Sequence, residues 1–161
     1  MTRNVVRRLH GKPTEQILLY LGGHGGCGKT RVIQAITHLF VKLGKQHELR
    51  LGAFTGTAAS GIDGSTISSL AQISSDPTRR SNQKKLEATW DTATTLIADE
   101  VSMIGCRMLS KTNKNITLAK KHADPDVPFG GLDVMFAGMF VGDCFNQLNE
   151  INDLSMYMHY M

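Results

Sequence analysis

The chain has 161 residues, of which 41% are hydrophobic and 20% are charged. This composition is typical of a single globular domain and excludes a largely disordered chain. No run approaches the ~20 apolar residues that a membrane-spanning helix needs, and we find no signal peptide. The net charge is +4, but the first 50 residues carry nine Lys or Arg against two acidic residues, a local balance of +7. This excess suits a polyanionic partner, although a solvated surface is the commoner explanation.

Alternating apolar and amphipathic segments follow one another along the chain. Four short apolar runs are typical of buried strands: 17–21, 49–54, 94–99 and 132–138. Residues 29–43 place apolar side chains at three- and four-residue steps, which predicts a helix ended by Gly44, and a mixed helical pattern covers 103–121. Three further segments are polar or rich in turn residues and are expected to be loops, the first with room for a short helix: 55–66, 74–85 and 124–131.

This order of elements predicts an α/β fold with a mostly parallel sheet and helices on both faces. Ligands of such sheets bind at the carboxyl ends of the strands. We divide the chain into a basic N-terminal segment (1–16), one domain (17–150) and a tail (151–161), whose end we expect to be frayed or sticky and not a metal or aromatic site.

The three cysteines, Cys27, Cys106 and Cys144, are odd in number and lack the spacing of metal ligands. This pattern favours free thiols in an intracellular protein over a disulfide scaffold.

The stretch "LGGHGGCGKT" (21–30) lies between the first predicted strand and the first predicted helix. It matches G-x-x-x-x-G-K-[ST], in which successive backbone N–H groups and a helix N-terminus surround phosphate oxygens. Lys29 would reach the β- and γ-phosphates, and the Thr30 hydroxyl would bind Mg²⁺. A glycine-rich turn before a surface lysine is the alternative, which the flanking strand and helix disfavour. The residues expected to bind the nucleotide are Gly23, Gly25, Gly26, Gly28, Lys29 and Thr30.

Two adjacent acidic residues end the third predicted strand, in "LIADE". After a phosphate-binding loop, Asp99 is expected to hold Mg²⁺, directly or through water, and Glu100 to orient or deprotonate the attacking water. A solvated helix cap is the alternative function of such a pair.

Four stretches, in this order, closely resemble the PIF-type DNA helicases, in particular those of fungal Helitron elements: "LGGHGGCGKT", "AFTGTAASGIDGSTISSL", "LIADEVSMIG" and "VPFGGLDVMFAG". The resemblance implies a P-loop NTPase that hydrolyses ATP with Mg²⁺ and moves 5′ to 3′ along single-stranded DNA in recombination and repair, with a nuclear location. The family has two RecA-like domains, and the resemblance covers only the first, from about Leu18 to Gly138. A second RecA-like domain or chain is therefore an expected partner.

By position, Thr55, Gly56, Thr57 and Ala58 match the family segment that touches the single strand. Small residues and hydroxyls suit this task because backbone N–H and threonine O–H groups approach DNA phosphates closely. Turn and cap formation is the alternative role of the threonines. Trp90 and the basic pairs at 79–80 and 84–85 are weaker DNA candidates, for which core packing and a solvated loop are the better expectation.

The sequence departs from the family after the fourth predicted strand. Met139 stands where the family has aspartate, and Gly142 where it has the γ-phosphate-sensing glutamine. A shifted alignment instead makes Asp143 and Gln147 the candidate γ-phosphate sensors, with exposed loop residues as the alternative. Gln16, next to the first strand, is a poor substitute for the family's adenine-binding glutamine.

We therefore expect a RecA-like domain of an ATP-dependent DNA helicase that, by itself, binds Mg-ATP and hydrolyses it weakly without unwinding duplex DNA. Two alternatives remain at this point. A degenerate nucleotide-binding fragment without catalysis is favoured by Met139. A small P-loop kinase would need a lid and a substrate-binding insertion, which the sequence does not clearly contain.

Overall fold

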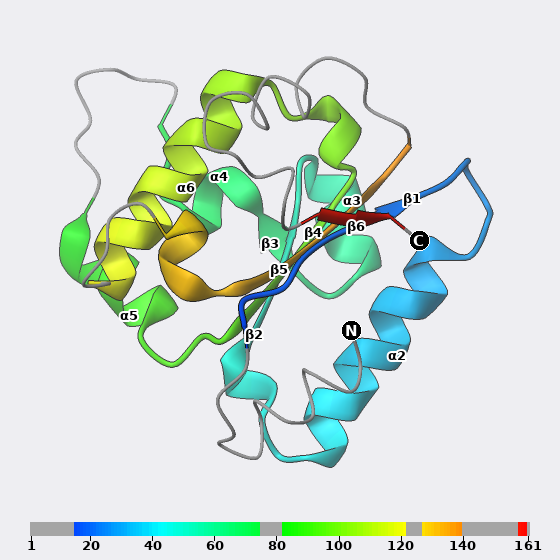
Figure 1. Ribbon diagram of the computed structural model, residues 1–161, viewed down its shortest axis with the longest axis horizontal. Helices are drawn as coiled ribbons and strands as arrows, with labels where there is room; N and C mark the ends of the chain where they lie inside the picture. Colours follow the sequence, from blue (N-terminus) through cyan, green and yellow to red (C-terminus); the bar gives the residue numbers. More distant parts are fainter. Residues whose placement is uncertain (1–14, 75–81, 122–126, 140–157, 161) are drawn as a thin grey trace.

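The computed structural model describes residues 15–74, 82–121, 127–139 and 158–160. Within these residues, six strands form one sheet in the order β3–β2–β4–β5–β1–β6, and every neighbouring pair is parallel (Figure 1). The strands are β1 (Leu18–Gly22), β2 (Leu49–Ala53), β3 (Ser65–Thr66), β4 (Thr95–Asp99), β5 (Asp133–Gly138) and β6 (Met158–Tyr160). The predicted parallel α/β class is confirmed.

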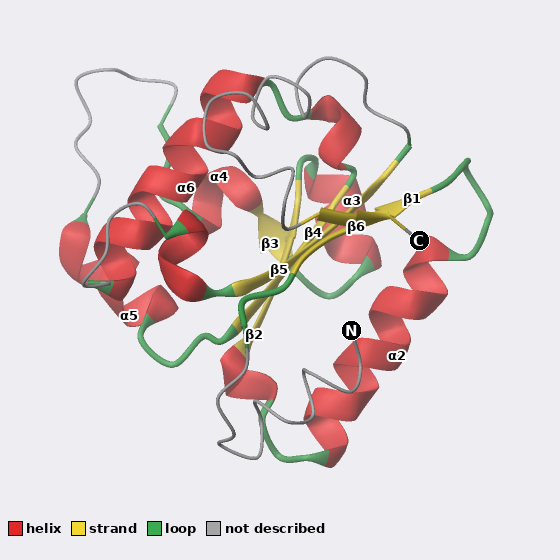
Figure 2. Cartoon of the chain, in the orientation of Figure 1, coloured by secondary structure: helices red, strands yellow, loops and turns green. Residues whose placement is uncertain are grey.

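Helices connect the strands and cover the sheet (Figure 2). The α-helices are α2 (Lys29–Lys42), α3 (Gly56–Gly61), α4 (Ile67–Leu70), α5 (Gln83–Trp90) and α6 (Cys106–Lys120). Three short 3₁₀ turns are η1 (Gln46–Glu48), η2 (Val101–Met103) and η3 (Pro128–Gly131). Figure 1 shows α2 on one side of the sheet and α4, α5 and α6 on the other.

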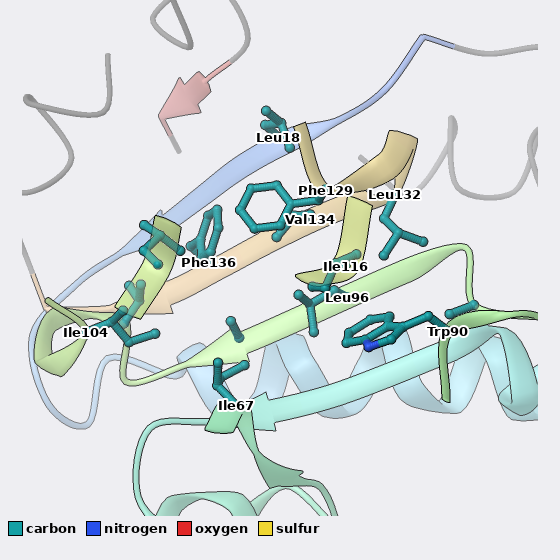
Figure 3. Close-up of a cluster of buried hydrophobic side chains, with 14 of the residues drawn as sticks. Leu18, Ile67, Trp90, Leu96, Ile104, Ile116, Phe129, Leu132, Val134 and Phe136 are labelled. Carbon is teal, nitrogen blue, oxygen red and sulfur yellow. The ribbon is translucent and has the colours of Figure 1, made fainter. Parts of the chain in front are cut away.

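The central strands are apolar at consecutive positions because side chains alternate between two buried faces. One core packs α2 and α3 against the sheet, with Ile33 and Phe40 beside Ile97. The other core packs α5 and α6 against the opposite face and contains Leu96 and Trp90 (Figure 3). β1, β4 and β5 therefore each contribute to both cores, which explains why these strands are unbroken apolar runs in the sequence.

The segment around Trp90 shows where sequence-based prediction was wrong. The expected loop over 74–85 overlaps α5, whose N-cap Asn82 accepts a hydrogen bond from the Lys85 N–H at 3.2 Å. Trp90 has no exposed surface, and its indole N–H donates to the Leu70 carbonyl at 3.1 Å, so the expectation of core packing is confirmed. Lys84 and Lys85 are exposed, and the pair at 79–80 lies outside the described residues.

Two smaller expectations are also corrected. The frayed end predicted for the tail is wrong for Met158–Tyr160, which pairs with β1 in parallel. Cys106 is disulfide-bonded, so the prediction of free thiols is wrong for this residue and holds for Cys27. Cys144 lies outside the described residues.

The sheet order brings four strand ends together at its carboxyl edge. β2, β4, β5 and β1 are consecutive neighbours, and in the register Ala53 is paired with Asp99 and Gly22 with Gly138. The loops that follow these strands contain nearly all the predicted functional residues, so the fold places them at one edge.

Candidate nucleotide site and strand-binding segment

The glycine-rich loop begins where β1 ends and closes on the N-terminus of α2. The Gly23 N–H donates to the Gly138 carbonyl at 3.1 Å, which ties the loop to the end of β5. Gly26 and Gly28 have φ angles of +78° and +94°, in the left-handed region that side chains disfavour. Gly28 is the N-cap of α2, whose first turn contains no acidic residue to neutralise the positive end of the helix dipole.

Lys29 is held against the inside of this loop. Its Nζ donates to the carbonyls of Gly23 and His24 at 2.7 and 2.8 Å, and lies 3.8 Å from the exposed Cys27 Sγ. These acceptors are neutral, so a phosphate would be a stronger partner for the ammonium group. The lysine is thus placed at the loop by local contacts that an anion could replace.

A cavity of about 540 Å³ lies beside the loop. It is lined by Gly25, Gly26, Gly28, Lys29, Thr30, Arg31, Gln34, Asp99, Glu100, Ser102, Met103, Gly138 and Met139. The structure therefore brings together most of the predicted nucleotide-binding residues and both predicted acids around one hollow. Gly23 is not among the lining residues, but is joined to the loop through Lys29.

The two acids are fixed by the backbone at the end of β4. Asp99 Oδ1 accepts a hydrogen bond from the Glu100 N–H at 2.8 Å. Glu100 has φ +54°, an uncommon conformation for a residue with a side chain. The turn beyond it packs against Gly138, where an added Cβ would come within 3.2 Å of the backbone nitrogens of Val101 and Ser102. This close packing holds the loop after β4 against the end of β5.

Thr55 links the predicted strand-binding segment to these acids. Its hydroxyl accepts from the Ala58 N–H at 3.2 Å, which caps α3, and it lies 3.1 Å from Glu100 Oε2, to which it donates. The capping role considered for this threonine is therefore confirmed. Gly56 and Thr57, the next two residues, are exposed.

Comparison with known proteins identifies the family. The model of the PIF1-like helicases matches residues 3–149. This chain belongs to the PIF1-like helicase family. It is 31% identical over 138 residues to the ATP-dependent DNA helicase PIF1 of Trypanosoma brucei brucei, covering 84% of this chain and 13% of that protein. It is 30% identical to the ATP-dependent DNA helicase RRM3 of Saccharomyces cerevisiae, covering 76% and 17%.

The fold is also that of solved PIF1-like helicases. The structure of Bacteroides Pif1 in complex with ADP-AlF3 and single-stranded DNA matches with a TM-score of 0.67 at 21% identity, over 100% of this chain and 41% of that one. The chain thus spans less than a fifth of the two curated relatives and less than half of this solved protein.

The departure from the PIF1-like pattern at Met139 is visible in the structure. Met139 is 56% exposed and lines the cavity, while its carbonyl accepts from the Tyr20 hydroxyl at 2.6 Å. The thioether offers only a weak acceptor where the family has a carboxylate. The alternative sensors, Asp143 and Gln147, lie outside the described residues.

Gln16 has a structural role at the opposite edge of the sheet. Its side-chain amide donates to the carbonyls of Pro128 and Leu132 at 2.7 and 2.6 Å. Gln16 is not among the residues that line the cavity.

Five lining residues were not predicted from the sequence: Arg31, Gln34, Ser102, Met103 and Gly138. Helical spacing was the available signal for the first two, because positions 31 and 34 lie one turn apart and follow directly on the loop. Ser102 and Met103 lie in η2, a turn that no periodic pattern predicts.

Proposed function

We propose that this chain is the first RecA-like domain of an ATP-dependent DNA helicase, and that by itself it binds Mg-ATP and hydrolyses it weakly. The observation that carries the proposal is the cavity shared by Lys29 and Thr30 of the glycine loop and by Asp99 and Glu100. Membership of the PIF1-like family supports the same assignment.

The loop is shaped for a polyphosphate. At Gly25, Gly26 and Gly28 an added Cβ would meet nothing within 4 Å, so the space in front of the backbone is open. The N-terminus of α2 and the Lys29 ammonium both favour negative charge there. A cavity of about 540 Å³ is within the usual range for small-ligand sites. A solved relative of this fold contains ADP-AlF3, which supports a nucleotide as the ligand.

The residues also suit a magnesium ion. Thr30 and Asp99 both line the cavity and supply the oxygen ligands that Mg²⁺ prefers. Among the described residues, no group of three or more His, Cys, Asp or Glu is placed to hold a metal by itself. This fits an ion that takes its remaining ligands from phosphates and water. When bound, it would neutralise charge on the phosphates during transfer.

Glu100 is the candidate base. Its carboxylate lines the cavity one residue beyond Asp99, and its backbone is fixed by the hydrogen bond from its N–H to Asp99. In this position it would accept a proton from the attacking water or orient that water. Lys29 would stabilise the charge that develops on the transferred phosphoryl group.

Single-stranded DNA is the proposed polymer substrate. Gly56 and Thr57 are exposed and follow Thr55, whose hydroxyl contacts Glu100, and they suit backbone N–H and hydroxyl contacts to phosphates. The +7 balance of the first 50 residues would favour binding of the polyanion and make this binding salt-sensitive. The solved Bacteroides relative carries single-stranded DNA.

The family resemblance alone supports four further proposals. They are movement from 5′ to 3′, a role in recombination and repair, a second RecA-like domain and a nuclear location. No described helix is long and apolar enough to cross a membrane.

One observation favours a narrower function. Met139 replaces a family carboxylate at the wall of the cavity, which suits a domain that binds nucleotide without turnover. An ATPase assay with Mg²⁺, with and without a single-stranded oligonucleotide, separates these functions. Stimulation by the oligonucleotide is the expected result. Nucleotide binding without any hydrolysis would support the narrower function, and absence of nucleotide binding would reject both.

A further inference from the structure

A hydrogen bond joins Thr55 to Glu100. Strand binding by the segment that begins at Thr55 does not require this bond, and neither does the action of Glu100 as a base. The two residues lie 45 positions apart and meet because β2 and β4 are parallel neighbours. The Thr55 hydroxyl has one proton, and it donates this proton to Glu100 Oε2 at 3.1 Å. The Thr55 hydroxyl oxygen accepts a hydrogen bond from the Ala58 N–H at 3.2 Å, so the hydroxyl is already used as donor and as acceptor.

We propose that Thr55 is a positioning residue that couples strand binding to the candidate base. Without a strand, its hydroxyl holds one carboxylate oxygen of Glu100. A strand phosphate that accepts the hydrogen bond of the Thr55 hydroxyl displaces this carboxylate. Glu100 is then free to accept a hydrogen bond, and later the proton, from the attacking water. The inference rests on the proposed function, because it takes Thr55 as part of the strand-binding segment and Glu100 as the base.

The competition follows from the chemistry of the three groups. A carboxylate and a phosphate diester are both acceptors without a proton to donate, and the single Thr55 proton serves one of them at a time. The oxygen's acceptor position is engaged by Ala58, which keeps the hydroxyl proton directed away from α3. The main chain of Glu100 is fixed by the Asp99 contact, so a change of partner at Thr55 moves the Glu100 side chain and not its backbone.

A double-mutant cycle on strand binding tests this coupling without needing turnover. The affinity of the 161-residue chain for an oligothymidylate of about 12 nucleotides is measured for the parent, Thr55→Val, Glu100→Ala and the double variant. Glu100→Ala removes a negative charge in both backgrounds, but it releases the hydroxyl proton only where Thr55 is present. We expect Glu100→Ala to strengthen binding at least about threefold more in the parent than in the Thr55→Val background, because groups in contact are not additive.

Two further variants separate coupling from loss of a helix cap. Thr55→Ser keeps the hydroxyl and should restore the parental coupling. Thr66 caps α4 with the same geometry, accepting from the Ser69 N–H at 3.2 Å, so Thr66→Val removes a comparable cap and should leave the Glu100→Ala effect at its parental size.

The outcomes distinguish the inference from the function on which it rests. Additive effects of Thr55→Val and Glu100→Ala, in chains that bind the oligonucleotide, would overturn the coupling and leave the helicase assignment standing. Thermal unfolding checks that the parent chain is folded. If the folded parent chain does not bind the oligonucleotide, both the coupling and the proposed function are overturned.

Discussion

The two edges of the sheet use the same kinds of side chain for different purposes. At the amino edge, where the strands begin, polar groups are matched to backbone groups. Gln16 donates to two carbonyls, and Asp133 Oδ1 accepts from the Ile17 N–H at 2.9 Å. At the carboxyl edge, Lys29, Asp99 and Glu100 all line one cavity. At the amino edge these polar side chains bind backbone groups of the protein itself, whereas at the carboxyl edge the charged residues line a cavity that a ligand could enter.

Two lysines make the contrast concrete. Lys120 Nζ donates to the carbonyls of Trp90, Asp91 and Ala93 at 2.9–3.2 Å, which include the C-terminal end of α5. Lys29 Nζ also donates to two carbonyls, with a longer contact to the Cys27 sulfur. The contacts of the two ammonium groups are therefore alike, and their surroundings differ. Lys29 lies beside glycines that admit a ligand, and Lys120 closes a helix end.

The largest expected effect is on turnover at the carboxyl edge. Glu100→Gln keeps the size of the side chain and its ability to accept from Thr55, but it removes the base. If the parent chain hydrolyses ATP, we expect the rate to fall by about 10²-fold or more, with nearly unchanged Mg-ATP binding. The rate is measured by phosphate release and the affinity by calorimetry. Equal rates for variant and parent would show that Glu100 is not the base.

The next effect separates the two lysines directly. Lys29→Ala should weaken ATP binding at least about 10-fold, because a charge-assisted contact to phosphate contributes roughly 1.5–3 kcal/mol. Lys120→Ala is the matched control, since it removes an ammonium group with the same type of carbonyl contacts, and it should leave ATP affinity unchanged in the folded protein. Equal losses of affinity in the two variants would remove the distinction between the edges.

The sequence predicted those parts of the molecule whose signal is local. β1, β4 and β5 are continuous apolar runs, and α2 has a strong helical period, so both the strands and the loop between β1 and α2 could be placed. α5 was missed because only Leu86 and Trp90 of its eight residues are buried, which leaves a polar segment without a visible period. β3 has two residues, too few for any pattern.

The candidate site was only partly predictable for the same reason. The loop and the two acids are contiguous motifs, and each follows a predicted strand. The contact between Thr55 and Glu100 depends on β2 lying beside β4, and the three carbonyls bound by Lys120 lie 27 to 30 positions away. Both facts follow from the order of strands and helices in space, which periodicity does not supply.

A smaller effect concerns stability at the amino edge. Lys120→Met keeps the length of the side chain but leaves three carbonyls without their shared donor. We expect a loss of about 1 kcal/mol in the free energy of unfolding, toward the lower end of the range for an unsatisfied group, because these carbonyls are near solvent. Lys29→Met should change stability less, since its acceptors lie in an exposed loop. Urea unfolding of both variants measures the difference, and a larger loss for Lys29→Met would contradict it.

The smallest expected effect is the pH dependence that Lys120 confers. Burial lowers the pKa of Lys120 below its ordinary 10.5, with a smaller opposing effect of Asp91 and a further lowering by Arg50. In the unfolded chain the pKa returns to its ordinary value, so between the lowered pKa and 10.5 the unfolded state binds more protons than the folded state. Stability conferred by this group therefore rises with pH across that interval and is lost as pH falls through the lowered pKa.

The free energy of unfolding of the parent, measured relative to Lys120→Met at several alkaline pH values, should increase as pH approaches 10.5. Because the other titrating groups are common to both proteins, their contributions cancel in the difference. A difference that stays constant with pH would mean that the carbonyls of the α5 terminus offset the effect of burial on the charged amine, and a difference that falls would mean that they outweigh it; either result would contradict the prediction.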